Sequence, residues 1–163
     1  MEKLLTFLQS IPEYKLLMQS VQQGECAAVT GVGQINRSHL AAGIFRDCGR
    51  PVVLICQDDM SAKRLSQELS AFLKLTAPTL PGREMTFYDA AVVSRSWEQR
   101  RIQQLYNLAS GQTKLQIFTW ESLSQRTMPP KTLLSAAFSL KVGEEYSQER
   151  LLERLTASGY SRC

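Results

Sequence analysis

The chain has 163 residues, of which 44% are hydrophobic, and a formal net charge of +4. This length suffices for one domain with a hydrophobic core and the beginning of a second. Basic residues are scattered, which disfavours a dedicated nucleic-acid or anionic-membrane surface, and weak DNA binding stays a minor alternative. No apolar run reaches the length of a membrane span, and the first residues do not resemble a signal peptide. The composition predicts a cytoplasmic protein.

Cysteine and histidine usage limits the chemistry. The four cysteines show no C-x-x-C spacing, and Cys26, Cys48 and Cys56 lie in apolar segments, which predicts reduced, buried thiols. His39 is the single histidine, which excludes most zinc sites and any Ser-His or Cys-His nucleophile. We therefore expect no metal site and no catalytic residues.

The first elements in chain order are two short helices, a strand and a third helix. Residues 2–9 are typical of a helix, and Ser10 and Glu13 have capping-box spacing for a second helix that ends at Gly24. The apolar run 26–29 predicts a buried strand. Apolar side chains at i, i+3, i+4 and i+7 then indicate a helix that ends at Gly49, namely Ala41, Ile44, Phe45 and Cys48.

The turn between this strand and helix resembles a phosphate-binding loop. A working loop reads G-x-x-x-x-G-K-[ST]: its backbone N–H groups surround the phosphates, its lysine reaches the outer phosphates and its hydroxyl binds magnesium. In this chain Gly31 is followed by Gly33 and then by Asn36, Arg37 and Ser38. Asparagine adds a Cβ where backbone must approach phosphate, and arginine is no copy of a compact ammonium. The pattern favours a degenerate loop, and an ordinary strand-to-helix turn is the alternative.

Alternating strands and helices continue to residue 126. The apolar run 51–56 predicts a central parallel strand covered on both faces. Asp58 or Asp59 can cap the next helix, whose buried stripe contains Leu69, and Thr79-Leu80 forms a brief strand. A helix over 96–110 with Ile102 on its apolar stripe, an alternating strand over 114–119 and a short helix over 120–126 follow. The alternation predicts a three-layer α/β domain with a mostly parallel sheet.

A change of character after Met128-Pro129-Pro130 indicates a second module. We place the boundary near residue 137, with residues 1–136 as the first domain and 137–163 as the beginning of an α+β module. Residues 138–142 alternate as a strand, and Ser147 opens a helix that stops at Gly159. A strand and one helix bury no core alone, so we expect this module to be cut short.

Several segments in a fixed order resemble the N-terminus of the bacterial transcription-repair coupling factors (Mfd). They are 80–89 (LPGREMTFYD), 98–101 (EQRR), 121–126 (ESLSQR), Pro129-Pro130, 140–143 (LKVG) and 159–162 (GYSR). This region of the family is similar to the excision-repair helicase UvrB, in its first motor domain and its UvrA-binding domain. The chain lacks room after Asp89 for the tyrosine-rich hairpin with which UvrB grips DNA. The resemblance therefore implies a UvrB-like module without helicase activity.

The same resemblance implies the partners. In the family the second module binds UvrA, partly through an arginine in a Tyr-x-Arg segment, which corresponds to Tyr160-Ser161-Arg162. The alternative to a UvrA contact, which stays equally open, is that Tyr160 packs after the helix and Arg162 is solvated. RNA polymerase, DNA, ATP and magnesium would be bound by other parts of a longer ATP-driven translocase. Two further interpretations are residual ATP binding at Gly31 to Ser38, with Glu121 holding magnesium, and a fragment of a UvrB-type helicase.

Overall fold

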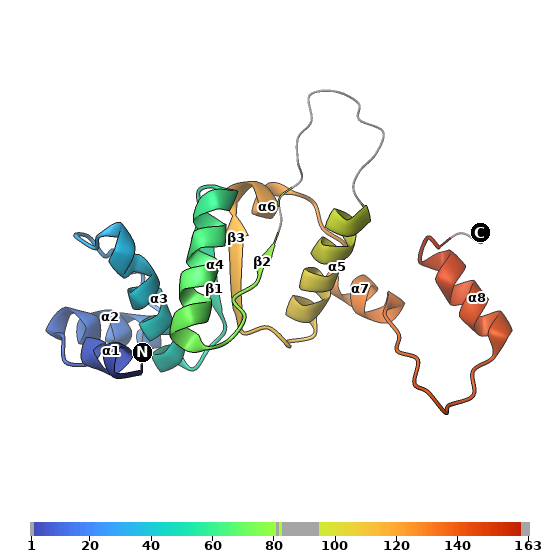
Figure 1. Cartoon of the computed structure of the whole chain (residues 1–163), viewed down its shortest axis with the longest axis horizontal. Helices are drawn as coiled ribbons and strands as arrows, with labels where there is room; N and C mark the ends of the chain where they lie inside the picture. Colours follow the sequence, from blue (N-terminus) through green and yellow to red (C-terminus); the bar gives the residue numbers. More distant parts are fainter. Residues whose placement is uncertain (1, 81, 83–94, 161–163) are drawn as a thin grey trace, which may run out of the picture. The chain divides into compact units, whose positions relative to one another are not determined.

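The computed structural model describes residues 2–80, 82 and 95–160 in two compact units, divided between Arg126 and Thr127. The first unit contains α1 (Glu2–Leu8), α2 (Pro12–Gln23), α3 (Gln34–Cys48), β1 (Val52–Cys56), α4 (Asp59–Leu73), β2 (Thr79–Leu80), α5 (Arg95–Ala109), β3 (Leu115–Thr119) and α6 (Trp120–Ser124) (Figure 1). The second contains α7 (Pro130–Ala136) and α8 (Gln148–Ala157). The expected functional domains 1–136 and 137–163 remain predictions.

The sheet of the first unit has three parallel strands in the order β1-β3-β2. Val52 pairs with Leu115 at one end of β1 and Cys56 with Thr119 at the other. The α/β class expected from the alternating elements is thereby confirmed. All five residues of β3 are buried, because this strand is central. The alternating pattern of residues 114–119 predicts one buried and one exposed face, and the structure shows no exposed face on this strand.

β1 occupies the edge of the sheet and not the predicted central position. Val53 and Ile55 are 52% and 58% exposed, so one face of the strand is uncovered within the part of the chain that the structure describes. A continuous apolar run cannot distinguish a central strand from an edge strand. Hydrogen bonding decides the order, and both β1 and β2 pair with β3.

The core lies between the covered face of this sheet and helices α3 and α4. Leu69 of α4 and Ile117 of β3 are fully buried in one apolar cluster that also contains Leu5 of α1. Asp58 caps α4 by accepting a hydrogen bond from the Ser61 amide at 2.7 Å, as expected. The buried stripe predicted for this helix is confirmed.

The N-terminal helices pack on α3 through a second cluster of Leu8, Tyr14 and Met18. Gly24 ends α2 in the left-handed conformation, at φ 75°, as predicted. The predicted capping box is wrong. Ile11 is the N-cap of α2 and makes no side-chain cap, because the Ser10 hydroxyl donates instead to the Phe7 carbonyl at 2.7 Å.

The predicted strand over residues 26–29 is absent, and these residues are irregular and exposed. Small side chains such as Ala27 and Ala28 bury little apolar area, so the run gains little from a covered position. Cys26 is exposed, so the buried thiol expected there is wrong, whereas Cys48 and Cys56 are half-buried. Burial raises the pKa of the Cys56 thiol.

The second unit contains the predicted helix but not the predicted strand. The Ser147 hydroxyl accepts a hydrogen bond from the Arg150 amide at the start of α8, as expected. Residues 138–142 form no strand, because no partner strand in this unit is available among the described residues. Arg154 of α8 instead lies 4.5 Å from the ring centroid of Phe138 and donates to the carbonyl of Ala137 at 3.4 Å.

Candidate functional site

The candidate site predicted from the sequence is the turn from Gly31 into the first residues of α3. Gly31 has φ 76°, a conformation that favours glycine, and Gly33 is the N-cap of α3 without a side-chain cap. The helix begins at Gln34, so Asn36 and Arg37 lie in its first turn. The Asn36 amide donates to the Gly33 carbonyl at 2.9 Å. This N–H group therefore closes the helix instead of facing a phosphate.

Ser38, which occupies the magnesium-binding position of a working loop, points into the protein. It is 2% exposed, and its hydroxyl donates to the Ile35 carbonyl at 3.3 Å. Ser38 also lies close to the Glu68 carboxylate of α4. Arg64, 2.8 Å from that carboxylate, is the main cause that lowers the pKa of Glu68, and Ser38 acts in the same direction. These residues do not fit an ATP–magnesium pair, because the serine hydroxyl is buried and donates to a carbonyl of its own helix.

Arg37 is exposed beside a small apolar hollow next to the turn. The hollow has a volume of about 180 Å³ and is bounded by the irregular segment before α3, by α3 and by β1. Val29 and Val32 come from the segment, Leu40 and Ile44 from the helix, and Val52 and Leu54 from the strand. The hollow is too small and too apolar for a nucleotide, whose phosphates need polar donors.

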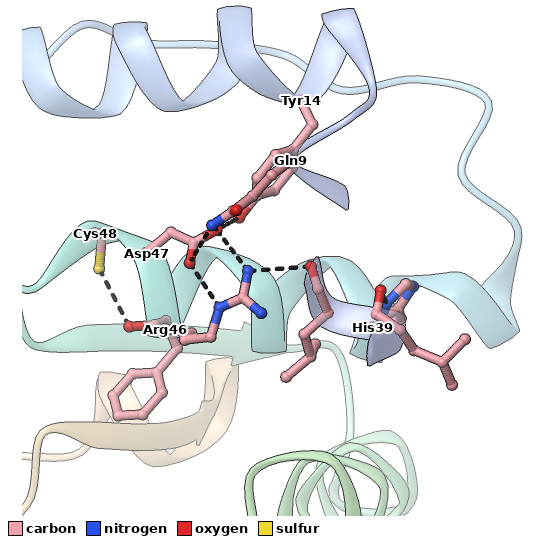
Figure 2. A network of polar contacts seen from close by, with 9 residues as sticks. Gln9, Tyr14, His39, Arg46, Asp47 and Cys48 are labelled. Carbon is pink, nitrogen blue, oxygen red and sulfur yellow. Dashed lines mark hydrogen bonds and ion pairs between the residues drawn. The ribbon is translucent and has the colours of Figure 1, made fainter. Parts of the chain in front are cut away.

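A polar network fixes α3, and thus the turn, against the first two helices (Figure 2). Asp47 accepts hydrogen bonds from the Tyr14 hydroxyl at 2.8 Å, from Nε and Nη2 of Arg46 at 2.6 and 3.0 Å, and from Gln9 at 3.4 Å. Arg46 also donates from Nη2 to the Leu5 carbonyl at 3.0 Å. These contacts lower the pKa of Asp47, chiefly through Arg46, while burial and Asp47 raise the pKa of Tyr14.

His39 has a structural position in the same region. Its Nε2 lies 2.9 Å from the Leu4 carbonyl, and its ring stacks on Phe72 with 5.4 Å between centroids. A single histidine in a sequence does not reveal such partners. Among the residues that the structure describes, no group of three or more His, Cys, Asp or Glu side chains is placed to hold a metal ion.

The carboxyl ends of the strands are the usual ligand edge of a parallel sheet, but their acidic groups have structural positions. After β1, Asp58 serves as a helix cap, and its hydrogen bonds with Ser61 lower its pKa. After β3, Thr119 and Ser122 form a capping box that starts α6. Glu121 is an exposed first-turn residue of α6, beside Gly82.

Arg101 is a buried residue near this edge that sequence reasoning missed. It is 7% exposed, and its Nη2 donates to the Ser122 carbonyl at 3.3 Å. Its guanidinium lies 5.8 Å from the ring centroid of Trp97, and burial lowers its pKa. In the predicted apolar stripe of α5, Ile102 is 55% exposed, whereas Leu105, Tyr106 and Ala109 are partly buried. The only available signal was the spacing of Trp97, Arg101 and Leu105 at i, i+4 and i+8.

The second predicted site lies at the end of the chain. Tyr160 is 68% exposed, and its amide donates to the Leu155 carbonyl at 3.0 Å, which fixes its backbone to the end of α8. Its side chain is therefore accessible, in contrast to the packed alternative. Arg162 lies outside the described residues, as does the segment around Phe87, Tyr88 and Asp89.

Three curated proteins, all transcription-repair coupling factors, are similar to this chain over most of its length. The protein of Escherichia coli (strain K12) is 29% identical over 147 residues, which is 90% of this chain and 12% of the relative. The Myxococcus xanthus protein is 24% identical over 152 residues, 88% of this chain and 13% of the relative. The Bacillus subtilis (strain 168) protein is 20% identical over 164 residues, 99% of this chain and 14% of the relative.

The chain is related to these transcription-repair coupling factors. It spans only 12–14% of their length. No protein-family model matches the chain, and no solved structure matches it significantly. Among the described helices, none has the length and hydropathy that would be needed to cross a membrane.

Proposed function

We propose that this chain is a non-catalytic, UvrB-like module of a transcription-repair coupling factor, and that it serves in nucleotide excision repair by recruiting UvrA. The observation that carries the proposal is the similarity to coupling factors over 88–99% of the chain. The buried Ser38 hydroxyl supports a scaffold with a degenerate phosphate loop over a nucleotide-hydrolysing domain.

The remaining activities belong to a longer parent protein. In this proposal the parent is an ATP-driven DNA translocase of the cytoplasm, whose other parts contact RNA polymerase and DNA and hold ATP with magnesium. The first unit is a three-layer domain in the manner of a helicase motor. The second unit provides the contact with UvrA.

Direct titration with UvrA tests the recruiting function. The full chain, labelled with a fluorophore, is titrated with UvrA, and binding is followed by anisotropy. We expect Tyr160→Ala and Arg162→Glu to weaken binding, because an exposed aromatic ring and a guanidinium are typical contact groups at interfaces. Arg150→Glu in α8 is the matched charge control. No binding of the natural chain would refute recruitment, and unchanged binding by both variants would refute the assignment of Tyr160 and Arg162.

Nucleotide binding is tested separately. The natural chain and an Asn36→Gly, Arg37→Lys variant, which restores the loop consensus, are titrated by calorimetry with Mg-ATP up to about 1 mM. We expect no binding by either protein, because neither substitution exposes the Ser38 hydroxyl or frees it from the Ile35 carbonyl. Binding by the natural chain would favour the alternative of residual ATP binding. Binding by the variant alone would show that the buried Ser38 hydroxyl is no obstacle to a nucleotide.

A further inference from the structure

The outer edge of β1 offers unpaired backbone groups. The Val52 amide donates to the Lys114 carbonyl at 2.8 Å, so the backbone groups of Val52, Leu54 and Cys56 face β3. In a parallel pair, the N–H and C=O groups of the intervening residues point the opposite way. The groups of Val53 and Ile55 therefore face the free edge, since β1 pairs with no other strand in the described parts of the chain.

Within Val52–Cys56, this edge strand contains no lysine, proline or bulge that would prevent strand pairing. Natural edge strands carry lysine, proline, a bulge or a covering loop. The sequence of β1 is Val-Val-Leu-Ile-Cys, it pairs in regular register over all five residues, and Val53 and Ile55 are more than half exposed. An apolar, unprotected edge of this kind is typical of a site to which an extended peptide adds as a further strand.

The two faces beside this edge can receive alternate side chains of an added strand. One face holds the exposed Val53 and Ile55. The other holds the hollow of about 180 Å³ between β1 and α3, with Val52 and Leu54 on the strand side and Leu40 and Ile44 on the helix side. Side chains of a strand alternate between faces, so every second residue of a docked peptide would meet apolar surface on the helix side.

Charge complementarity indicates the chemistry of the peptide. Arg37 lines the hollow, is exposed, and forms no ion pair with any residue that the structure describes. The first turn of α3 beside it contains no acidic residue and no side-chain cap. A carboxylate would meet both the guanidinium and the positive end of the helix dipole.

We propose that the edge of β1 binds an extended segment of a partner protein by strand addition. Every second residue of this segment is apolar, and one of these apolar side chains occupies the hollow. The segment also carries an aspartate or glutamate that pairs with Arg37. This interaction goes beyond UvrA recruitment, because it uses neither Tyr160 nor Arg162.

The probe is a fluorescein-labelled peptide that alternates threonine and valine and carries one aspartate near its end. We expect saturable anisotropy with the full chain, and slowed amide exchange at Val53 and Ile55 on binding. Arg37→Gln should weaken binding about tenfold, the typical loss for one charge-assisted contact. The same loss should follow from replacing the peptide aspartate by asparagine, and Lys15→Gln, which removes a cation outside the hollow, should have no effect.

A peptide with proline at its centre provides the control for backbone pairing, because proline lacks the N–H donor. It should not bind. No saturation up to about 1 mM of the aspartate peptide would overturn the proposal. So would equal binding of the proline peptide. Protection of the Val53 and Ile55 amides without peptide would also refute it. If that protection depends on protein concentration, the edge pairs with a second copy of the chain. If it does not, another part of the same chain covers the edge.

Discussion

Removing the hydroxyl of Tyr14 tests the network that holds α1 and α2 on α3. Tyr14 is 5% exposed and donates to Asp47 Oδ2 at 2.8 Å. Tyr14→Phe deletes this one donor and leaves the ring in place. A hydrogen bond to a charged group contributes about 1.5–3 kcal/mol. We expect a loss near the lower bound, about 1.5 kcal/mol, because Arg46 and Gln9 still donate to the carboxylate.

Asp47→Asn has a larger expected effect. The carboxylate receives donors from Tyr14, Arg46 and Gln9, and an amide presents one oxygen and an NH₂ group to the same donors. We expect a loss of about 3 kcal/mol, since a partly buried guanidinium also loses its counter-charge. The two residues are in contact, so their losses should not add. The double variant should show a coupling energy of about 1 kcal/mol.

The same carboxylate predicts an acid dependence. Hydrogen bonds, chiefly from Arg46, hold the pKa of Asp47 below its ordinary value of 3.8. A depressed folded pKa adds stability that is fully present above the unfolded pKa and is lost as pH falls through the folded pKa. The difference in unfolding free energy between the natural chain and Asp47→Asn should therefore be constant above about pH 5 and shrink below about pH 4.

The free energy of unfolding is measured by urea unfolding, followed by circular dichroism. The measurement covers the natural chain, the two single variants and the double variant. Amide exchange of α2 and α3 adds a local readout of the same contact. A Tyr14→Phe loss under about 0.3 kcal/mol would contradict the assigned hydrogen bond. A pH-independent difference for Asp47→Asn would contradict the ionised state of the carboxylate.

Four further substitutions test packing and capping by urea unfolding. Leu69→Ala should cost about 2–5 kcal/mol, because the side chain is fully buried, whereas Val53→Ala at the exposed edge should cost under about 1 kcal/mol; equal losses would contradict the assigned core. Thr119→Val keeps the shape and removes the cap of α6, with an expected loss of about 1–2 kcal/mol, and a neutral result would contradict the capping box. Gly43→Ala should destabilise by about 1 kcal/mol despite its better helix propensity, since the new methyl group meets Leu8 Cδ1 and lies 3.1 Å from the Tyr14 hydroxyl. A gain in stability would show that Leu8 can move aside.

Helices and their ends were predictable because their signals are local. Gly24 ends α2, Asp58 caps α4 and Ser147 caps α8, and each of these assignments depends only on residues within one or two turns. The failed capping box at Ser10 shows the limit of this reasoning. Ser10 bonds back to Phe7, because a hydroxyl at a helix end can serve the preceding helix as well as the following one.

Strand positions were less predictable, because pairing is non-local. The apolar run of β1 fits a central strand and an edge strand equally well, and the outcome depends on β3, which lies about sixty residues away in sequence. Residues 26–29 and 138–142 have strand-like patterns and no strand partner among the described residues. A sequence pattern indicates which side chains share a face of a strand, but only the tertiary fold provides the neighbouring strand.

Arg101 and Ser38 show why site predictions need the tertiary structure. In the sequence Arg101 is one of the scattered basic residues, and Ser38 occupies the hydroxyl position of the degenerate loop. In the structure both side chains are buried: Arg101 donates to the Ser122 carbonyl, and the Ser38 hydroxyl donates to the Ile35 carbonyl. Helix α3 begins at Gln34, and this start places Ser38 on the face that contacts α4. The presence of serine at this position is therefore no evidence for nucleotide binding.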